Sequence, residues 1–395
     1  GRIDAHRAAA VALRAGYVKG QVLRQSDLQP LPHALVTAFD HEGEQQGQVT
    51  ADDDGHYYLA LPEGMYNVEA SAFGYEPITA HDLSVPADET ITLDFQLSGA
   101  PAGVLWGQVT NTETGVPISA QILVENTPAR TVSDPQTGQY SMALPAGTYT
   151  VQVGQNGFRR STVPEMPISV DQATRLDIAL TPAPTILFVD SGRWYYGSKG
   201  SYFKYALDEK DYVYDVWDVR SLETDVPVAS DLAPYDITVW SSPLDSPGMI
   251  SAGDVISSYL ESGGNLLLTG QDVGYCDSGI SGWIWHPYYR DLLKADILGD
   301  NAGRSSVIGV PGELMDGISL EMNGSDSAEN QYSPDLIDTL DPLDASLIAM
   351  YEESGGAALR ARGCQSYNAI YLAAGLEGLG DREGRAEVMD RALTW

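Results

Sequence analysis

Cysteine and basic residues are both scarce in this sequence. Two of the 395 residues are cysteine, Cys276 and Cys364, and 22 are lysine or arginine against 55 aspartate or glutamate. The two cysteines form no Cys-x-x-Cys pair, so a zinc site or a redox motif has no support, while one disulfide or a plain buried thiol stays open. A formal charge of −33 repels phosphate backbones and anionic membranes, which argues against nucleic-acid binding. The acidity itself indicates solubility, or else cation binding in an extracellular setting.

Long apolar runs are also missing. No stretch is long enough to cross a bilayer, and 43% hydrophobic residues predict a soluble globular protein without a membrane span. At about 100 to 200 residues per domain, the length predicts two to four domains. No signal peptide is visible, and Gly1 falls in the middle of an expected element, so we expect an excised fragment of a longer protein.

An internal repeat is the strongest organisational signal in the chain. Residues 54–68, DGHYYLALPEGMYNV, align with residues 137–151, TGQYSMALPAGTYTV, at an offset of 138 − 55 = 83. The offset persists at Leu93 against Leu176, and the openings GQV at 20–22 and 107–109 also match. Strands with alternating faces, joined by Pro-x-Gly turns, predict a β-sandwich for each copy.

The GxV opening and the DGxYxLxLPxGxYxV core resemble the carboxypeptidase regulatory-like, transthyretin-like family over residues 17–98 and 104–181. Within the first copy, Asp52 to Asp54 could form a calcium loop. The second copy has SDPQT at the same turn, which favours a solvated hairpin tip. We interpret the repeated tyrosines as packing residues, with glycan binding as the alternative role of the copies: Tyr57, Tyr66, Tyr140 and Tyr149.

The first residues, GRIDAHRAAAVALRA, predict an Ala-rich helix with Asp4 as its N-cap. GRIDA followed by Ala8 and Ala9 resembles the closing helix of subtilisin-family catalytic domains. The resemblance implies that residues 1–16 end a catalytic domain that lies upstream in the same chain. The Gly-Thr-Ser-Met-Ala segment of that family is absent, and the six histidines lie in no recognisable nucleophile–base context. We therefore expect no peptidase activity from this fragment itself.

The composition changes after the stiff linker Pro182-Ala183-Pro184. Buried strands alternate with helices, which predicts βαβ units and a parallel sheet. The strands are expected at 186–190, 214–219, 235–240, 265–269 and 369–374, and the helices at 201–208, 254–262 and 382–395. The segments ILFVD, DLAPYDITVW, GGNLLLTGQD and AIYLAAGLEG resemble the class I glutamine amidotransferase-like fold, a three-layer α/β fold of the flavodoxin-like group, over residues 184–395.

Residues 270–274, GQDVG, correspond to the nucleophile elbow G-x-C-x-G of that family. The resemblance implies that Asp272 replaces the cysteine nucleophile, that Glu377 is the remnant orienting acid, and that Gly375 replaces the histidine base. We therefore predict a degenerate elbow with no catalytic residue, no cofactor and no metal ligand set.

Ligands of open α/β sheets bind beyond the carboxyl ends of the strands. The binding candidates at that edge are Asp190, Gln271, Asp272 and Glu377, joined by Asn330 and Gln331 and by the loop aromatics Trp194 and Trp285. The alternative is that these polar groups only cap helices and bond loops.

An enzymatic alternative gives the third domain amide hydrolase or transferase activity through Cys276 with His286, or through the Asp272/Glu377 pair. A nucleophilic cysteine needs a depressed pKa, whereas this acidic loop would raise it. The favoured hypothesis is a non-catalytic accessory region of a secreted or cell-surface subtilisin-like serine endopeptidase. It would act as a spacer, interaction or stabilising module, with the upstream peptidase domain, a cell-surface protein or a glycan as partner.

Overall fold

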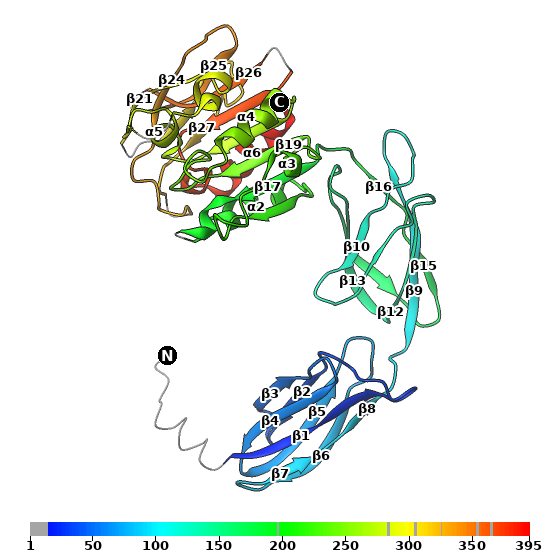
Figure 1. Ribbon diagram of the computed structural model, residues 1–395. Helices are drawn as coiled ribbons and strands as arrows, with labels where there is room; N and C mark the ends of the chain where they lie inside the picture. Colours follow the sequence, from blue (N-terminus) through cyan, green and yellow to red (C-terminus); the bar gives the residue numbers. More distant parts are fainter. Residues whose placement is uncertain are drawn as a thin grey trace. The chain divides into compact units, whose positions relative to one another are not determined.

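The computed structural model describes residues 15–195, 197–282, 285–303, 306–324, 326–352, 355–363 and 366–395. The chain forms two compact units (Figure 1). The first comprises the residues through Val109 together with Pro117–Val153 and Thr162–Ile178. The second comprises Thr110–Val116, Gly154–Ser161 and Ala179–Trp395, and each unit is described here by itself.

The first repeat forms two four-stranded sheets. One has the order β4-β1-β7, with β8 also paired to β1, and the other has the order β3-β2-β5-β6. The strands are β1 (Ala15–Arg24), β2 (Leu35–Phe39), β3 (Gln45–Thr50), β4 (His56–Pro62), β5 (Gly64–Ser71), β6 (Ile78–Val85), β7 (Thr90–Thr92) and β8 (Phe95–Leu97). Alternate side chains of both sheets meet in one apolar core, as the period of two in the sequence requires.

The second repeat has the same connectivity. Its sheets have the orders β12-β9-β15, with β16 also paired to β9, and β11-β10-β13-β14. The strands are β9 (Ala102–Asn111), β10 (Gln121–Val124), β11 (Arg130–Val132), β12 (Gln139–Pro145), β13 (Gly147–Gly154), β14 (Ser161–Ile168), β15 (Ala173–Arg175) and β16 (Ile178–Leu180).

The repeated tyrosines make the same bonds in both copies. The hydroxyl of Tyr57 donates to the Leu93 carbonyl at 2.6 Å, and that of Tyr140 donates to the Leu176 carbonyl at 2.7 Å. In the next strand, Tyr66 and Tyr149 each donate to a proline carbonyl four residues earlier at 2.9 Å. The ring of each fills packing space while its hydroxyl satisfies a carbonyl, which is how tyrosine is usually buried.

The hairpin tips of the two copies are also built alike. Asp52 accepts the backbone N–H groups of Asp54 and His56, and Asp134 accepts those of Gln136 and Thr137. A carboxylate that closes its own turn in this way is a common turn device. One carboxylate is enough for it, so the additional acids of the first copy are not needed to explain the turn.

The helix predicted for residues 1–16 requires a correction at its end. Residues 1–14 lie outside the described residues, but Ala15 and Gly16 belong to β1, where they pair with Pro62 and Leu61. A Cβ atom at Gly16 would lie 2.2 Å from the Pro86 carbonyl oxygen. Close packing of this strand against the turn near Pro86 therefore requires glycine, and the strand extends two residues further than the helical pattern suggested.

The second unit is organised on a mixed sheet of eleven strands. Its path runs β18-β17-β19-β20-β27-β26-β25-β22-β23, and β24 joins β21 to β26. The first five are parallel to one another: β18 (Asp215–Asp218), β17 (Ile186–Asp190), β19 (Ile237–Ser241), β20 (Asn265–Thr269) and β27 (Asn368–Leu372). The other strands pair antiparallel: β21 (Ala295–Gly299), β22 (Val307–Gly309), β23 (Ser319–Leu320), β24 (Leu336–Thr339), β25 (Ala345–Tyr351) and β26 (Gly356–Arg362).

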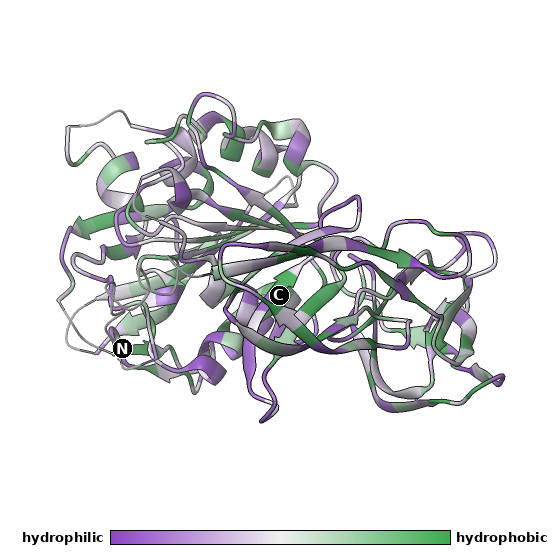
Figure 2. Ribbon diagram, turned by 90° about the horizontal axis from the view of Figure 1, so that it is seen from below, coloured by the Kyte–Doolittle hydropathy of each residue, from purple (hydrophilic) through white to green (hydrophobic). Residues whose placement is uncertain are grey.

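Helices cover both faces of the parallel part. One core contains α2 (Gly200–Glu209) and α6 (Arg382–Thr394), and the other contains α3 (Ala229–Leu232) and α4 (Gly253–Glu261). Because both faces are covered, strands such as β17 and β20 are continuous apolar runs. Figure 2 shows strongly hydrophobic segments in several strands and helices of the chain, and hydrophilic residues in many of its loops. Among the described residues, no helix is long and apolar enough to cross a membrane.

The segment Gly154–Ser161 belongs to this unit through Arg159. The guanidinium of Arg159 lies 3.6 Å from the centre of the Tyr212 ring and donates to Asp390 at 2.8 Å. It also donates to the Tyr212 hydroxyl at 2.7 Å. Stacking and a charge-assisted bond together anchor this segment beside α6.

Candidate functional site

The carboxyl ends of β17, β19, β20 and β27 meet at one edge of the parallel sheet, where a ligand of an open α/β sheet would bind. The chain after each strand is polar and largely buried. Asp190, Ser241, Thr269 and Gln271 are each no more than 1% exposed. The sequence predicted two of these four residues, Asp190 and Gln271, as binding candidates. The structure shows whether such groups are free to contact a ligand or are bonded within the chain.

Gln271 is bonded at both ends of its amide. Its nitrogen donates to the carbonyls of Pro243 at 3.0 Å and Asn330 at 2.8 Å. Its oxygen accepts the N–H groups of Tyr332 at 2.7 Å and Ser333 at 3.0 Å. An amide whose two donors and two acceptor positions are all used is a structural link between loops. Gln271 therefore does not contact a ligand in this arrangement.

Asp272 stands where the sequence comparison expected a nucleophile, at the N-cap of the short helix α5 (Val273–Asp277). Its own side chain caps no helix N–H. Burial, together with the nearby charges of Asp300 and Asp245, raises the pKa of Asp272 to about 6. A carboxyl group of this kind binds a proton near neutral pH, yet no described cation lies beside it to make it a better nucleophile.

The N–H groups of α5, which could otherwise stabilise an oxyanion, are taken by Asp335. This fully buried carboxylate accepts from Gly274 N at 2.6 Å and from Tyr275 N at 3.3 Å, and the Tyr371 hydroxyl donates to it at 3.1 Å. Its other oxygen, Oδ1, has no hydrogen-bond partner. Burial raises the pKa of Asp335 well above its ordinary value. An internal acid thus occupies the anion position at the start of the helix.

The place of the missing base is also filled from within. A Cβ atom at Gly375 would lie 2.2 Å from Glu377 Oε1 and 2.6 Å from Gln331 Nε2. Glu377 Oε1 accepts from Asn330 Nδ2 at 2.9 Å and from Gln331 Nε2 at 3.3 Å. The side chain of Gln331 also accepts the Gly375 N–H at 2.8 Å. A larger residue at position 375 would displace this network.

Glu377 is entirely buried, and its Oε2 has no partner. Burial raises the pKa of Glu377, and the charge of Asp190 adds to the effect. Asp190 accepts the Ser198 hydroxyl and the Gly192 N–H, and burial raises its pKa too. The structure therefore bonds Glu377 to the candidates Asn330 and Gln331, and Asp190 at the end of β17 acts on Glu377 through its charge.

Of the two aromatic binding candidates, Trp194 lies at the polar edge and Trp285 does not. Trp194 belongs to the 3-10 helix η1 (Ser191–Trp194) and donates its indole N–H to Asp245 at 3.0 Å, beside the same strand ends. Trp285 is 47% exposed and packs its Cβ near Gly279. No contact joins Trp285 to the polar edge among the described residues.

Cys276 is a buried, free thiol in α5. Its proposed disulfide partner, Cys364, lies outside the described residues. Burial raises the pKa of Cys276 to about 12, and the charges of Asp277 and Asp272 act in the same direction. Asp277 itself accepts from the hydroxyls of Ser246 at 2.6 Å and Tyr288 at 2.5 Å, with His286 close to it across Gly248. A thiol of this pKa is a poor nucleophile.

Sequence reasoning missed three acids that shape this edge: Asp245, Asp277 and Asp335. Asp245 lies in the loop after β19, Asp277 ends the short helix α5, and Asp335 precedes β24. None of them directly follows a strand or belongs to a periodic pattern, so no signal in the sequence marks them. Among the described residues, no group of three or more His, Cys, Asp or Glu side chains is placed to hold a metal ion.

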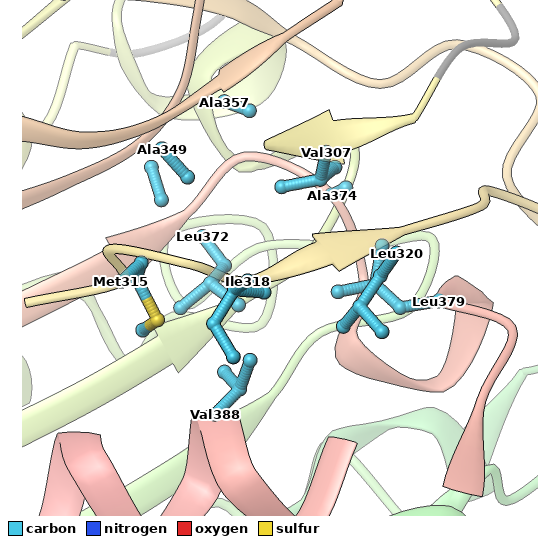
Figure 3. A pocket seen from close by; sticks show the side chains of 11 residues that line it. Val307, Met315, Ile318, Leu320, Ala349, Ala357, Leu372, Ala374, Leu379 and Val388 are labelled. Carbon is cyan, nitrogen blue, oxygen red and sulfur yellow. The ribbon is translucent and has the colours of Figure 1, made fainter. Parts of the chain in front are cut away.

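One apolar cavity beneath α6 has a volume of about 10 Å³ and is lined by Met315, Ile318, Leu320 and Val388 among others (Figure 3). A cavity of that size holds at most one water, and an apolar lining keeps it dry. It is a packing defect of the core rather than a ligand site.

Comparison with known proteins supports the reading of the repeats. Residues 17–98 and 104–181 each match the model of the carboxypeptidase regulatory-like domain. The chain therefore contains two such domains, and the family predicted for the repeats is confirmed. Over 118 residues the chain is 30% identical to Bacillopeptidase F of Bacillus subtilis (strain 168). The match covers 29% of this chain and 8% of that protein's length.

Some solved structures match part of the chain at low similarity. The Bacillus anthracis TIE protein is 19% identical with a TM-score of 0.21, over 45% of this chain and 36% of its own. The shaft pilin SpaA of Lactobacillus rhamnosus GG is 10% identical with a TM-score of 0.25, over 43% of this chain and 98% of its own.

Proposed function

We propose that this chain is the non-catalytic accessory region of a secreted or cell-surface subtilisin-like serine endopeptidase. The carboxypeptidase regulatory-like domains act as spacers or interaction modules. The domain at 184–395 is a degenerate member of the class I glutamine amidotransferase-like fold that serves as a stabilising or binding module. The similarity to Bacillopeptidase F, a peptidase by name, supports the peptidase context.

The observation that carries the non-catalytic role is the internal filling of the elbow. Asp335 takes the helix N–H groups at 2.6 and 3.3 Å, and Gln331 and Glu377 occupy the space in which a base at position 375 would sit. An acyl-transfer site needs a nucleophile, a base beside it and free N–H donors for the oxyanion. Here the donors are used, the base has no room, and the thiol of Cys276 is protonated at neutral pH.

The strand order supports the fold proposed for this domain. Numbered along the chain, the five parallel strands β18-β17-β19-β20-β27 stand in the order 2-1-3-4-5, which is the order of flavodoxin-like sheets. Fold alone does not give function, so the functional part of the proposal rests on the filled elbow.

Three measurements test this function. The purified 395-residue chain should hydrolyse neither casein nor glutamine above the buffer blank, and the reading frame upstream of residue 1 should encode a subtilisin-like catalytic domain. In the full polypeptide, deleting residues 17–395 should shorten the half-life of peptidase activity at elevated temperature while leaving initial casein hydrolysis intact. Amide hydrolysis by the isolated chain, or a reading frame that starts near residue 1, would refute the proposal.

A further inference from the structure

The second carboxypeptidase regulatory-like domain has an exposed aromatic groove that its packing does not explain. The groove has a volume of about 620 Å³ on the outer face of the β12-β9-β15 sheet. Its lining includes Val104, Trp106, Gln139, Ser141 and Ala173. Trp106 is 40% exposed and Val104 is 39% exposed, although both are apolar. Leu105, which lies between them on β9, is buried in the core.

Trp106 is held in place from one side. The Arg175 guanidinium lies 5.1 Å from the centre of the indole and forms an ion pair with Asp177 at 2.8 Å. Arg175 and Ser141 are the residues opposite Trp106 on the two neighbouring strands. The indole is thus positioned before any ligand arrives, which reduces the entropy lost on binding.

The first domain carries aromatic residues on the equivalent face. Tyr17 and Tyr58 stack with their ring centres 5.0 Å apart, and Tyr58 is 54% exposed. Tyr58 pairs across the strands with Lys19, and this pair corresponds to Ser141 and Trp106 in the second domain. The aromatic residue has moved from one strand to the other between the two copies, yet each copy presents one to solvent at the same place on the sheet.

The chemistry of the groove fits a neutral ligand. Every residue that lines it is uncharged, in a chain with a formal charge of −33. Arg175 is already paired, so no free cation attracts an anionic polymer. Trp106 lies on β9, which is paired on both sides, so the groove offers side chains and no free backbone N–H or C=O for an added peptide strand. Ser141 and Gln139 supply a hydroxyl and an amide beside the ring.

We propose that this groove binds a neutral polysaccharide, with a sugar ring stacked on Trp106 and its hydroxyl groups bonded to Gln139 and Ser141. The inference rests on the proposed function in taking the sandwiches as interaction modules, to which it adds a ligand class. A binding face of this kind would hold the parent protein at a carbohydrate-containing surface, with the first domain as a second contact.

Affinity electrophoresis of the whole 395-residue chain tests the proposal. Native gels would contain a soluble β-glucan, xylan, galactomannan or starch, with alginate as the anionic comparison. We expect retardation in at least one neutral gel and none in alginate. Trp106→Ala should weaken the binding about tenfold or more, since burying an indole against a sugar removes much apolar surface from water. Ser141→Glu, which removes no packing and places a charge in the groove, should weaken it similarly.

Trp285→Ala is the matched control, because it removes a similarly exposed indole from the second unit. It should leave the retardation unchanged. The proposal is overturned if no neutral polysaccharide retards the chain, if Trp106→Ala and Ser141→Glu bind as the parent does, or if only alginate binds. Self-association that Trp106→Ala abolishes, without sugar binding, would make the face an interface between copies and also overturn it. None of these outcomes bears on the casein and thermal-inactivation measurements that test the accessory role.

Discussion

The sandwiches and the α/β domain bury polar groups in opposite ways. In the sandwiches, the tyrosine hydroxyls reach a carbonyl in both copies, so each polar group is neutral and bonded. At the carboxyl edge of the α/β sheet, acids are buried among neutral polar groups, and Asp335 and Glu377 each keep an oxygen without a partner. Neutral bonded groups cost little to bury, whereas a carboxyl group either ionises at a high desolvation cost or takes up a proton.

This difference teaches where each region has specialised. The tyrosine hydrogen bonds occur in both copies because they satisfy buried carbonyl groups that the sandwich fold itself creates. The acids at the sheet edge stand where a ligand would bind in a related fold, and they accept hydrogen bonds from backbone, amide and hydroxyl groups of the chain instead. Under the proposed function, an edge that is filled by its own side chains keeps the fold of an active site without its chemistry.

Gly375→His gives the largest expected effect, because it tests whether the edge is full. The new side chain must displace Glu377 and Gln331, whose atoms lie 2.2 and 2.6 Å from its Cβ position. We expect a loss of about 3 kcal/mol or more in the free energy of unfolding and no gain of amide hydrolysis. Tryptophan fluorescence in urea is the measurement, since six of the seven tryptophans lie in residues 194–395.

Gly299→Ala is the control for this variant, because a Cβ atom there would meet no atom within 4 Å. It should change the unfolding free energy by less than about 0.5 kcal/mol. A Gly375→His variant that is as stable as its parent would show that the edge has free space, and the contrast between the two regions would weaken.

Asp335→Ala tests the role of the internal acid. The substitution removes the acceptor of the Tyr371 hydroxyl and the nearer of the two acceptors of the Gly274 N–H, and it opens a small cavity. We expect a loss of about 3 kcal/mol in the same fluorescence measurement. Asp335→Asn keeps an acceptor oxygen and should lose less. Asp338→Ala, an exposed neighbour, should lose almost nothing, and equal losses at 335 and 338 would contradict the assignment.

Asp272→Asn tests the pH dependence that the acids bring. The pKa of Asp272 is about 6 in the folded chain against an ordinary value of 3.8. At a pH between these two values, the carboxyl group therefore binds a proton when the chain folds. Its stabilising contribution is complete below pH 4 and is lost as the pH rises through 6. Two pKa units correspond to roughly 3 kcal/mol, which partial exposure reduces to about 2 kcal/mol.

The measurement compares parent and variant in urea at several values between pH 4 and pH 7.5. The variant should equal its parent near pH 4 and exceed it in stability by about 2 kcal/mol at pH 7. The comparison cancels the other acids, because both proteins contain them. A stability difference that does not change with pH would show that Asp272 titrates normally.

The sequence predicted one half of this edge and not the other. Strands β17 and β20 have the predicted bounds because each is a continuous apolar run closed by turn residues, and their following polar groups, Asp190 and Gln271, were therefore placed correctly after them. The sequence also predicted Gln331 and Glu377 as binding candidates, but it did not predict that they fill the space beside Gly375. That contact joins residues 44 positions apart, and no local pattern records it.

The antiparallel half of the sheet was missed for a similar reason. Its strands β21 to β26 are short or interrupted by bulges, as at Leu347 to Met350, so the period of two is lost over the distances that a pattern needs. Asp335 lies just before β24 in this half, and its bond to Gly274 spans 61 residues. The fold of the two repeats is easier to predict, because the same turn and the same tyrosines occur in both sequences.

Tyr57→Phe should give the smallest effect and serves as the neutral counterpart of the acid variants. It removes the bond to the Leu93 carbonyl without removing the ring, so we expect a loss of about 1 kcal/mol. Because burial raises the pKa of Tyr57 further above its ordinary value, its hydroxyl does not titrate between pH 4 and pH 7.5. The loss should therefore be the same across that range.

Hydrogen exchange of the peptides that contain β4 and β7 measures this loss of stability locally, and Tyr140→Phe should have the same effect on β12 and β15. If the effect of either substitution instead followed pH as Asp272→Asn does, the distinction between neutral and acidic burial would fail, since both regions would then respond to the same titrating groups.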